Sequence, residues 1–366
     1  MQNPGQPGVS THKLQTACRQ PAGRPPNIFP LGLSRQIFPA RPKKHPGQAA
    51  PCIPNPAGVN YNSRQVMKMN QPEKKGGWIK YAGNPVLGGD YGVCFDVCVL
   101  RQESGYRMYF SWRDKGSIAM AESRDGYTFD APRIVLAPGD AGEVEHVNRP
   151  AVVCHGGRYH MWYTGQIKPG MPDGISYIFY AASDDGEHFT PVSQQPVIRP
   201  EAAWEKSAVM SPHVLFDGEQ QLYKMWYSAG ENYEPNAIGY AVSHDGLHWE
   251  KYPRNPVFIA AGQGWDSHKV AGCQVIRRKE DYIMFYIGYR NDDAARIGMA
   301  CSKNGIDGWV RHPGNPIVSP DPGAWDGDAC YKPYALFDGQ NWRLYYNGRK
   351  GGVEQIGLAE YAGADL

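Results

Sequence analysis

The sequence contains no run of about 18 apolar residues, and its amino terminus lacks a basic start followed by an apolar stretch. No membrane-spanning helix and no secretory signal can therefore be identified. The eight cysteines form no C-x-x-C pair and no Cys/His cluster at zinc spacing, and nucleotide-binding and G-x-S-x-G fingerprints are missing. We expect a soluble protein of a cytosol-like compartment, with reduced thiols, no metal and no cofactor.

Acidic residues are missing from positions 1–72, which hold nine Lys or Arg and 13 prolines. Because nine of the 38 basic residues lie here, 29 remain against 36 acidic residues in the rest of the chain. The apolar positions of this segment show no helical or alternating period, so we predict a basic, Pro-rich, disordered extension without a catalytic role. An organelle transit peptide is the alternative, but such peptides are Ser-rich and amphipathic. Nucleic-acid binding is not favoured, since aromatic and Arg/Gly interleaving is missing.

A unit of about 60 residues recurs from residue 78 onward. Turns of the form S-x-D/N-G place their glycine at Gly126, Gly186, Gly246 and Gly305. An aromatic motif recurs five times, as YRMYFSW, YHMWYTG, YKMWYSA, YIMFYIG and WRLYYNG. Alternating apolar residues, aromatic enrichment and Asp-Gly turns predict four antiparallel strands per unit, which is typical of a propeller blade.

The last unit stops one strand short, at IGLAEY. A matching strand stands at the other end of the repeats, because WIKYAGNPVL at 78–87 resembles WEKYPRNPVF at 249–258 and WVRHPGNPIV at 309–318. A chain whose first strand completes its last blade closes a ring. We therefore predict an all-β domain over residues 73–366, a five-bladed β-propeller with four antiparallel strands per blade, closed by strand 78–87 in blade five.

This topology predicts which residues meet at the central opening. In each blade the innermost strand begins on the face where the second strand ends, so we expect the chemistry there and the Asp-Gly turns on the opposite face. The positions that open the innermost strands align in the repeat but differ in residue type, which indicates specialised roles. They are Asp96, Arg149, Ser211, Gly272 and Lys332.

Three carboxylic acids are candidates for catalysis. Asp96 is flanked by apolar residues that would desolvate it, so it is a candidate base or nucleophile, or the partner of a nearby arginine. Acetal hydrolysis needs a second carboxyl group as proton donor, and the candidates are Glu145 and Glu205. Glu205 also has a structural interpretation, because an acid repeated in all five units is typical of a loop-capping hydrogen-bond acceptor. The repeated acids are Asp90, Glu143, Glu205, Asp266 and Asp326.

The predicted mouth is rich in basic side chains for an acidic domain, which favours a ligand with carboxylate, phosphate or sulfate groups. The alternative is that these cations neutralise the nearby acids. Aromatic residues here would stack on sugars or pack the blade ends, and the histidines at the mouth are too dispersed to indicate zinc. The candidate substrate-binding residues are Tyr91, Trp112, Arg113, Arg149, His213, Glu231, His268, Lys269, Arg290, Asp328, Lys332 and Arg349.

Residues 78–361 resemble the five-bladed propeller glycosidases, a superfamily of arabinanases, β-xylosidases, fructosidases and mannoside phosphorylases in glycoside hydrolase families 43, 32 and 130. The shared motifs are the W-D/E pair, the MWYSG-like strand, the IGYA-x-S-x-DG turn and the W-x-x-x-x-NPV strand. The resemblance implies that Asp96 is the base or nucleophile and that Glu205 corresponds to the third-blade acid. The second-blade Asp of the superfamily has no counterpart, because Asn148-Arg149-Pro150 stands there.

Three functions follow as hypotheses. The first is a glycosidase that cleaves a small glycoside or furanoside with two carboxylates. The second is a phosphorylase, in which phosphate held by Arg149, Lys269 or Lys332 replaces water. The third is a non-catalytic propeller that binds an anionic sugar or a protein segment. A small carbohydrate is the expected partner, with no nucleic acid and no membrane.

Overall fold

The computed structural model describes residues 76–141, 144–169, 174–230 and 235–366. The predicted extension over residues 1–72 lies outside the described residues. Within them, the domain is built almost entirely from β-strands, with five short 3₁₀ helices between them. These are η1 (Gly89–Tyr91), η2 (Arg113–Lys115), η3 (Pro138–Ala141), η4 (Ala203–Glu205) and η5 (Gly264–Asp266).

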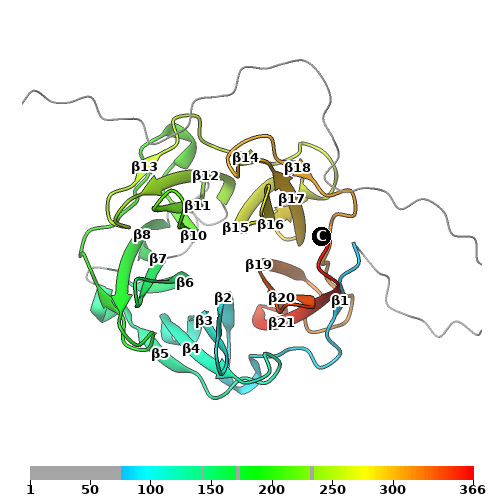
Figure 1. Ribbon diagram of the computed structural model, residues 1–366. Helices are drawn as coiled ribbons and strands as arrows, with labels where there is room; N and C mark the ends of the chain where they lie inside the picture. Colours follow the sequence, from blue (N-terminus) through cyan, green and yellow to red (C-terminus); the bar gives the residue numbers. More distant parts are fainter. Residues whose placement is uncertain (1–75, 142–143, 170–173, 231–234) are drawn as a thin grey trace, which may run out of the picture. The chain divides into compact units, whose positions relative to one another are not determined.

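Five antiparallel sheets radiate from a common centre, which confirms the five-bladed propeller (Figure 1). Blade one contains β2 (Cys94–Gln102), β3 (Gly105–Trp112), β4 (Ser117–Ser123) and β5 (Arg133–Leu136). Blade two contains β6 (His146–His155), β7 (Arg158–Lys168), β8 (Ile175–Ser183) and β9 (Thr190–Pro191). Blade three contains β10 (Val209–Asp217), β11 (Leu222–Gly230), β12 (Pro235–Ser243), β13 (Glu250–Lys251) and the additional β14 (Phe258–Ile259). Blade four contains β15 (Lys269–Arg277), β16 (Tyr282–Tyr289), β17 (Ala295–Ser302) and β18 (Val310–Arg311).

The fifth blade joins the two ends of the domain. It contains β19 (Ala329–Phe337), β20 (Asn341–Lys350) and β21 (Val353–Ala362) from the carboxyl end of the chain, and β1 (Ile79–Lys80) from the other end. β1 pairs antiparallel with β21, with Ile79 opposite Glu360. A further bridge joins Leu87 to Ile356. The prediction that the segment 78–87 closes the ring in blade five is therefore confirmed.

Aromatic strands and Asp-Gly turns hold neighbouring blades together. The phenol of Tyr109 in blade one donates a hydrogen bond to the carbonyl of Gly186 in blade two, and the indole of Trp162 in blade two donates to Gly246 in blade three. Since the ring of Trp162 is fully buried against blade three, the same side chain supplies both core volume and a satisfied polar atom. The repeated glycines therefore belong to the scaffold that joins neighbouring blades.

The described residues include no helix with the length and apolar character that crossing a membrane requires.

Candidate active site at the propeller axis

Each innermost strand is interrupted by a bulge at the position that the repeat aligns. The residue at the bulge has a positive φ in every blade, for example 59° at Asp96 and 50° at Lys332, and the strand register shifts beside it. A non-glycine residue with left-handed backbone is uncommon, and such strain gathers at functional sites. The bulge re-aims one residue per blade within the inner strands. The five residues are Asp96, Arg149, Ser211, Gly272 and Lys332.

Hydrogen bonds from one blade to the next support four of these bulges. The backbone amide of the bulge residue donates to a side-chain oxygen on the second strand of the preceding blade, at 2.8 to 3.1 Å. At the fifth junction the acceptor position holds the apolar Ile287. The donor and acceptor pairs are Asp96 with Asn347, Arg149 with Ser111, Ser211 with Thr164, and Gly272 with Ser228.

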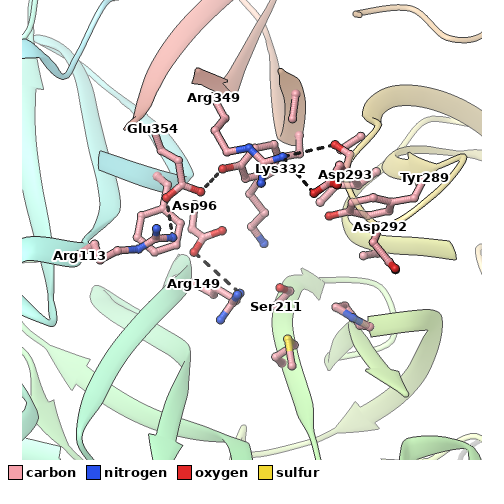
Figure 2. Close-up of a pocket in the computed structure, with 18 of the residues that line it drawn as sticks. Asp96, Arg113, Arg149, Ser211, Tyr289, Asp292, Asp293, Lys332, Arg349 and Glu354 are labelled. Atoms are coloured by element: carbon pink, nitrogen blue, oxygen red, sulfur yellow. Dashed lines mark hydrogen bonds and ion pairs between the residues drawn. The ribbon is translucent and has the colours of Figure 1, made fainter. Parts of the chain in front are cut away.

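A cavity of about 190 Å³ opens at these bulges. It is strongly polar, and Figure 2 shows its charged side chains converging from blades one, two, four and five. Four of the five bulge residues line it. The polar residues of its wall are Asp96, Arg113, Arg149, Ser211, Tyr289, Asp292, Asp293, Tyr331, Lys332, Arg349 and Glu354.

Asp96 is held in one orientation on the cavity wall. Its side chain is buried, and its Oδ2 accepts a hydrogen bond of 3.1 Å from the hydroxyl of Ser111. The Nε of Arg149 lies 3.8 Å from the same oxygen. Ser111 also accepts the backbone amide of Arg149 at 2.8 Å, so one hydroxyl positions both members of the pair. A carboxylate fixed in this way at the base of a cavity is suited to act on a bound ligand.

Glu354, in β21, is a second buried carboxyl group on the same wall. Its Oε1 accepts a hydrogen bond from the hydroxyl of Tyr331, and the Nη2 of Arg113 lies 2.5 Å from its Oε2. Burial raises the pKa of Glu354 above its ordinary value. Arg113 offsets this only in part, since its side chain is 43% exposed and water screens its charge. A carboxyl group with a raised pKa is suited to donate a proton.

A second cavity of about 220 Å³ adjoins the first between blades one and two. The two cavities share Phe95, Arg113 and Arg149 in their walls. The second is also lined by Trp112 and by Gln166, whose amide oxygen accepts a hydrogen bond of 2.8 Å from Asn148. Asn148 in turn accepts from Nη1 of Arg149 at 3.1 Å. Arg149 therefore stands between two adjoining compartments.

The structure does not bring Glu205 to these cavities. Its side chain is fully buried, and its Oε2 accepts the backbone amides of Glu201 at 2.6 Å and Ala202 at 2.9 Å. Burial by itself would raise the pKa of Glu205, but these amides outweigh it together with Lys251 and Tyr227, so the pKa is lowered. An acid that is ionised at neutral pH and saturated with donors is a scaffold group and a poor proton donor.

A related arrangement recurs in blades four and five, where the repeated acids are also buried acceptors of the scaffold, whereas Asp90 in blade one is exposed. In blades three to five a buried carboxylate before the innermost strand receives a tyrosine from the second strand and a cation from the outer strand. Glu143 lies outside the described residues. The three sets are Glu205 with Tyr227 and Lys251, Asp266 with Tyr286 and Arg311, and Asp326 with Tyr346 and Lys80.

Two other predicted residues also stand apart from the first cavity. Glu145 is exposed at the start of blade two, where its backbone amide donates to the carbonyl of Gln166 at 2.8 Å. His213 is buried in the inner strand of blade three, with its Nε2 2.9 Å from the carbonyl oxygen of Val275. Burial lowers the pKa of His213 to about 4, so it is neutral at physiological pH. Neither residue lines either cavity.

The remaining predicted binding residues lie at or near the rim. Lys269 and His268 both contact Asp292 of the cavity wall, at 2.7 and 3.1 Å. The carboxylate of Asp328 accepts the amide of Gly351 at 2.7 Å and so caps a turn. The backbone carbonyl of Tyr91 accepts a hydrogen bond of 2.7 Å from the indole of Trp112. Arg290 is exposed, and Glu231 lies outside the described residues.

Comparison with known proteins places this geometry in a family. Residues 82–359, most of the chain, match the description "Glycosyl hydrolases family 43". The protein belongs to glycosyl hydrolases family 43. Membership makes it glycoside hydrolase-like and supports the resemblance stated above. A solved structure titled as a thermostable family-43 glycoside hydrolase has a TM-score of 0.61 at 20% identity, covering 75% of this chain and 91% of that one, which shows the shared propeller fold.

Two curated relatives show how far sequence similarity to this family 43 protein extends. The uncharacterized protein Rv1502 of Mycobacterium tuberculosis (strain ATCC 25618 / H37Rv) is 28% identical over 270 residues, which cover 69% of this chain and 87% of the relative. An acid beta-fructofuranosidase of Phaseolus vulgaris is 33% identical over 113 residues, 28% of this chain and 17% of the relative. The similarity to the fructofuranosidase is therefore local.

The sequence motifs of this family 43 protein did not identify Glu354, which the structure adds as a functional candidate. It stands at the start of the third strand of its blade, where Gly116, Ser176, Asn236 and Ala295 stand in the other blades. An acid at a position that is small or uncharged elsewhere breaks the symmetry of the repeat, and this signal identifies it. Within the described residues, no group of three or more His, Cys, Asp or Glu is arranged to hold a metal ion.

Proposed function

We propose that this protein hydrolyses the glycosidic bond of a small glycoside bound in the axial cavity. Asp96 acts on the anomeric carbon, directly or through a water molecule, and Glu354 protonates the leaving oxygen. The bond from the anomeric carbon to that oxygen breaks, and water supplies the hydroxyl of the released sugar. The adjoining cavity with Trp112 and Gln166 takes the other side of the glycoside.

The observation that carries this proposal is the contrast between two buried carboxyl groups on one wall. Each faces a guanidinium and a hydroxyl donor, but at Glu354 burial outweighs these partners and raises the pKa. When two carboxyl groups have surroundings that differ in this way, one can act as the base and the other as the proton donor. Glu205 and Glu145 lie outside both cavities, so neither enters the proposal.

Turnover of a panel of glycosides by Asp96→Asn and Glu354→Gln tests these roles. Asp96→Asn should slow cleavage of every substrate by roughly 10²- to 10⁴-fold. Glu354→Gln should slow alkyl glycosides by a similar factor but nitrophenyl glycosides far less, because nitrophenolate leaves without protonation. The anomeric configuration of the first product distinguishes direct attack by Asp96 from attack by water. Equal turnover by the wild type and both variants would contradict the proposal.

One observation favours a second function, sugar binding without cleavage. Four of the five bulge positions at the axis carry no carboxylate, since Arg149, Ser211, Gly272 and Lys332 stand there. In this case the same cavity recognises a sugar and leaves its bonds intact. Saturable binding of a glycoside that is not cleaved by the wild type, and whose affinity is the same for Asp96→Asn, would favour this second function.

A further inference from the structure

Among the described residues, Lys332 is the one cation of the axial cavity wall that pairs with none of the wall's acids. Each acid on the wall already faces a lysine or arginine, at 2.5 to 3.9 Å. Lys332 is the cation that remains, and Figure 2 shows its amino group extending into the cavity. The pairs are Asp96 with Arg149, Glu354 with Arg113, Asp292 with Lys269, and Asp293 with Arg349.

Lys332 is buried, with 5% of its surface exposed, and its Nζ has no hydrogen bond or ion pair with any described residue. An ammonium group taken out of water without a partner is unfavourable unless a ligand supplies the missing negative charge. Burial accordingly lowers the pKa of Lys332, and the attraction of Asp96 does not fully offset this. The amino group is therefore available to a ligand and is not part of an internal ion pair.

Two features of the backbone make room for the side chain of Lys332 in the cavity. Its backbone lies at the bulge of β19, with a φ of 50°, which directs the side chain into the axis. The neighbouring bulge residue is Gly272, and a Cβ there would stand only 3.3 Å from Cδ of Lys332. Because Gly272 has no side chain, the lysine stem passes beside it without displacement.

Arg149 supplies further donors on the same cavity wall. Its Nη1 donates to Asn148 and its Nε faces Asp96 at 3.8 Å, whereas its Nη2 makes no hydrogen bond with the described residues. Guanidinium and ammonium donors that remain open in a buried cavity are suited to carboxylate or phosphate oxygens.

We propose that Lys332 and Arg149 form an oxyanion subsite in the axial cavity, and that the ligand places a carboxylate or phosphate group there. The identity of the sugar rests on the proposed function, but the oxyanion subsite does not require that any bond is cleaved. The oxyanion is either a substituent of the sugar, as in a uronic acid, or a free phosphate ion bound beside a neutral sugar.

Calorimetric titration of the full-length chain with glucuronate, inorganic phosphate and glucose tests the subsite. Glucuronate or phosphate should bind to the wild type, and Lys332→Met should weaken that binding roughly tenfold to a hundredfold. Lys332→Arg should retain it. The matched control is Lys303→Met, which removes the same charge from an exposed turn in the S-K-N-G motif. This control should leave the affinity unchanged.

The thermal unfolding temperature is a second measurement, which shows whether a variant that fails to bind is still folded. Without ligand, Lys332→Met should unfold at the same or a higher temperature than the wild type, because it removes an unpaired buried charge. Added glucuronate or phosphate should raise the unfolding temperature of the wild type but not that of Lys332→Met.

The outcomes separate this inference from the proposed function. Binding of glucuronate indicates a substituent on the sugar, and binding of phosphate alone indicates the free ion. If neither anion binds, or if Lys332→Met binds them as well as the wild type, the subsite is wrong even where neutral glycosides are hydrolysed. Conversely, an oxyanion that binds equally to the wild type and to Glu354→Gln, but more weakly to Lys332→Met, supports the subsite even if no glycoside is cleaved.

Discussion

Lys80 and Asp326 form an ion pair of 2.5 Å, although 246 residues separate them in the sequence. The carboxylate of Asp326 is fully buried and also accepts the hydroxyl of Tyr346 at 3.0 Å. Lys80 thus occupies in blade five the position that Lys251 occupies in blade three, where the whole blade is continuous in sequence. The first strand of the domain therefore brings both backbone pairing and a specific charge to the last blade.

Lys80→Met should destabilise the propeller, because it leaves the buried carboxylate of Asp326 without its cation. We expect a loss of about 2–4 kcal/mol in the free energy of unfolding, measured by urea denaturation. Lys251→Met removes the equivalent cation from a continuous blade and should lose a similar amount. Hydrogen exchange should rise in β21 for the Lys80 variant alone. A Lys80 variant as stable as the wild type would show that the ion pair does not support closure.

Glu205→Gln should weaken the fold and spare catalysis. A glutamine can keep its carbonyl oxygen on the backbone amides of Glu201 and Ala202, but its NH2 group then faces the ammonium of Lys251, so we expect a loss of about 3 kcal/mol in the free energy of unfolding. The turnover number of the folded fraction should stay within about twofold of the wild type. Glu354→Gln is the matched comparison and should show the reverse pattern. A large fall in turnover for a fully folded Glu205 variant would return this residue to the active site.

Ser111→Ala should impair catalysis through Asp96, since Ser111 is a positioning residue. Its hydroxyl joins Oδ2 of Asp96 to the backbone amide of Arg149. We expect the turnover number to fall about tenfold with little change in KM, because one hydrogen bond to the carboxylate is lost. Ser228→Ala is the control, since Ser228 makes the same kind of bond to the amide of Gly272 and touches no acid in the cavity. Equal losses of activity in both variants would indicate a merely structural role.

Activity toward alkyl glycosides should decline as the pH rises through the raised pKa of Glu354, because the ionised form has no proton to donate. Glu354→Gln should remove this alkaline limb from the pH profile. The contribution of Glu354 to the free energy of unfolding should also decline as the pH rises. A folded-state pKa above the unfolded value of about 4.3 gives stability that is complete below that value and is lost as the pH rises through the folded pKa. A pH profile of the wild type without an alkaline limb would contradict the donor role.

Much of the architecture follows from local pattern. The 60-residue unit, the Asp-Gly turns and the likeness of 78–87 to two outer strands were sufficient to predict five blades and their closure. The same alignment selected the five bulge positions, because a position that opens every inner strand reaches the axis in every blade. Asp96, Arg149 and Lys332 were found in this way, and all three line the cavity.

The proposed proton donor was not selected by the sequence motifs. Glu205 matched the expected acid in the aligned motifs, but backbone amides and Lys251 occupy its carboxylate. Glu354 stands 258 residues after Asp96, at the start of the third strand of its blade, where the sequence motifs selected no candidate. Only the meeting of blades one and five places both on one cavity wall.

The sequence by itself determined the ring, because repeated hydrophobic alternation and turn residues specify a blade locally, and closure needs only one matching strand at the other end. The tertiary structure alone decided which acids and cations form ion pairs and which cations are left to bind a ligand. Burial, distance and hydrogen-bond saturation depend on side chains that arrive from different blades. No spacing within one repeat can encode that Asp96 lies beside the guanidinium of Arg149 while Lys332 forms no ion pair with the described acids.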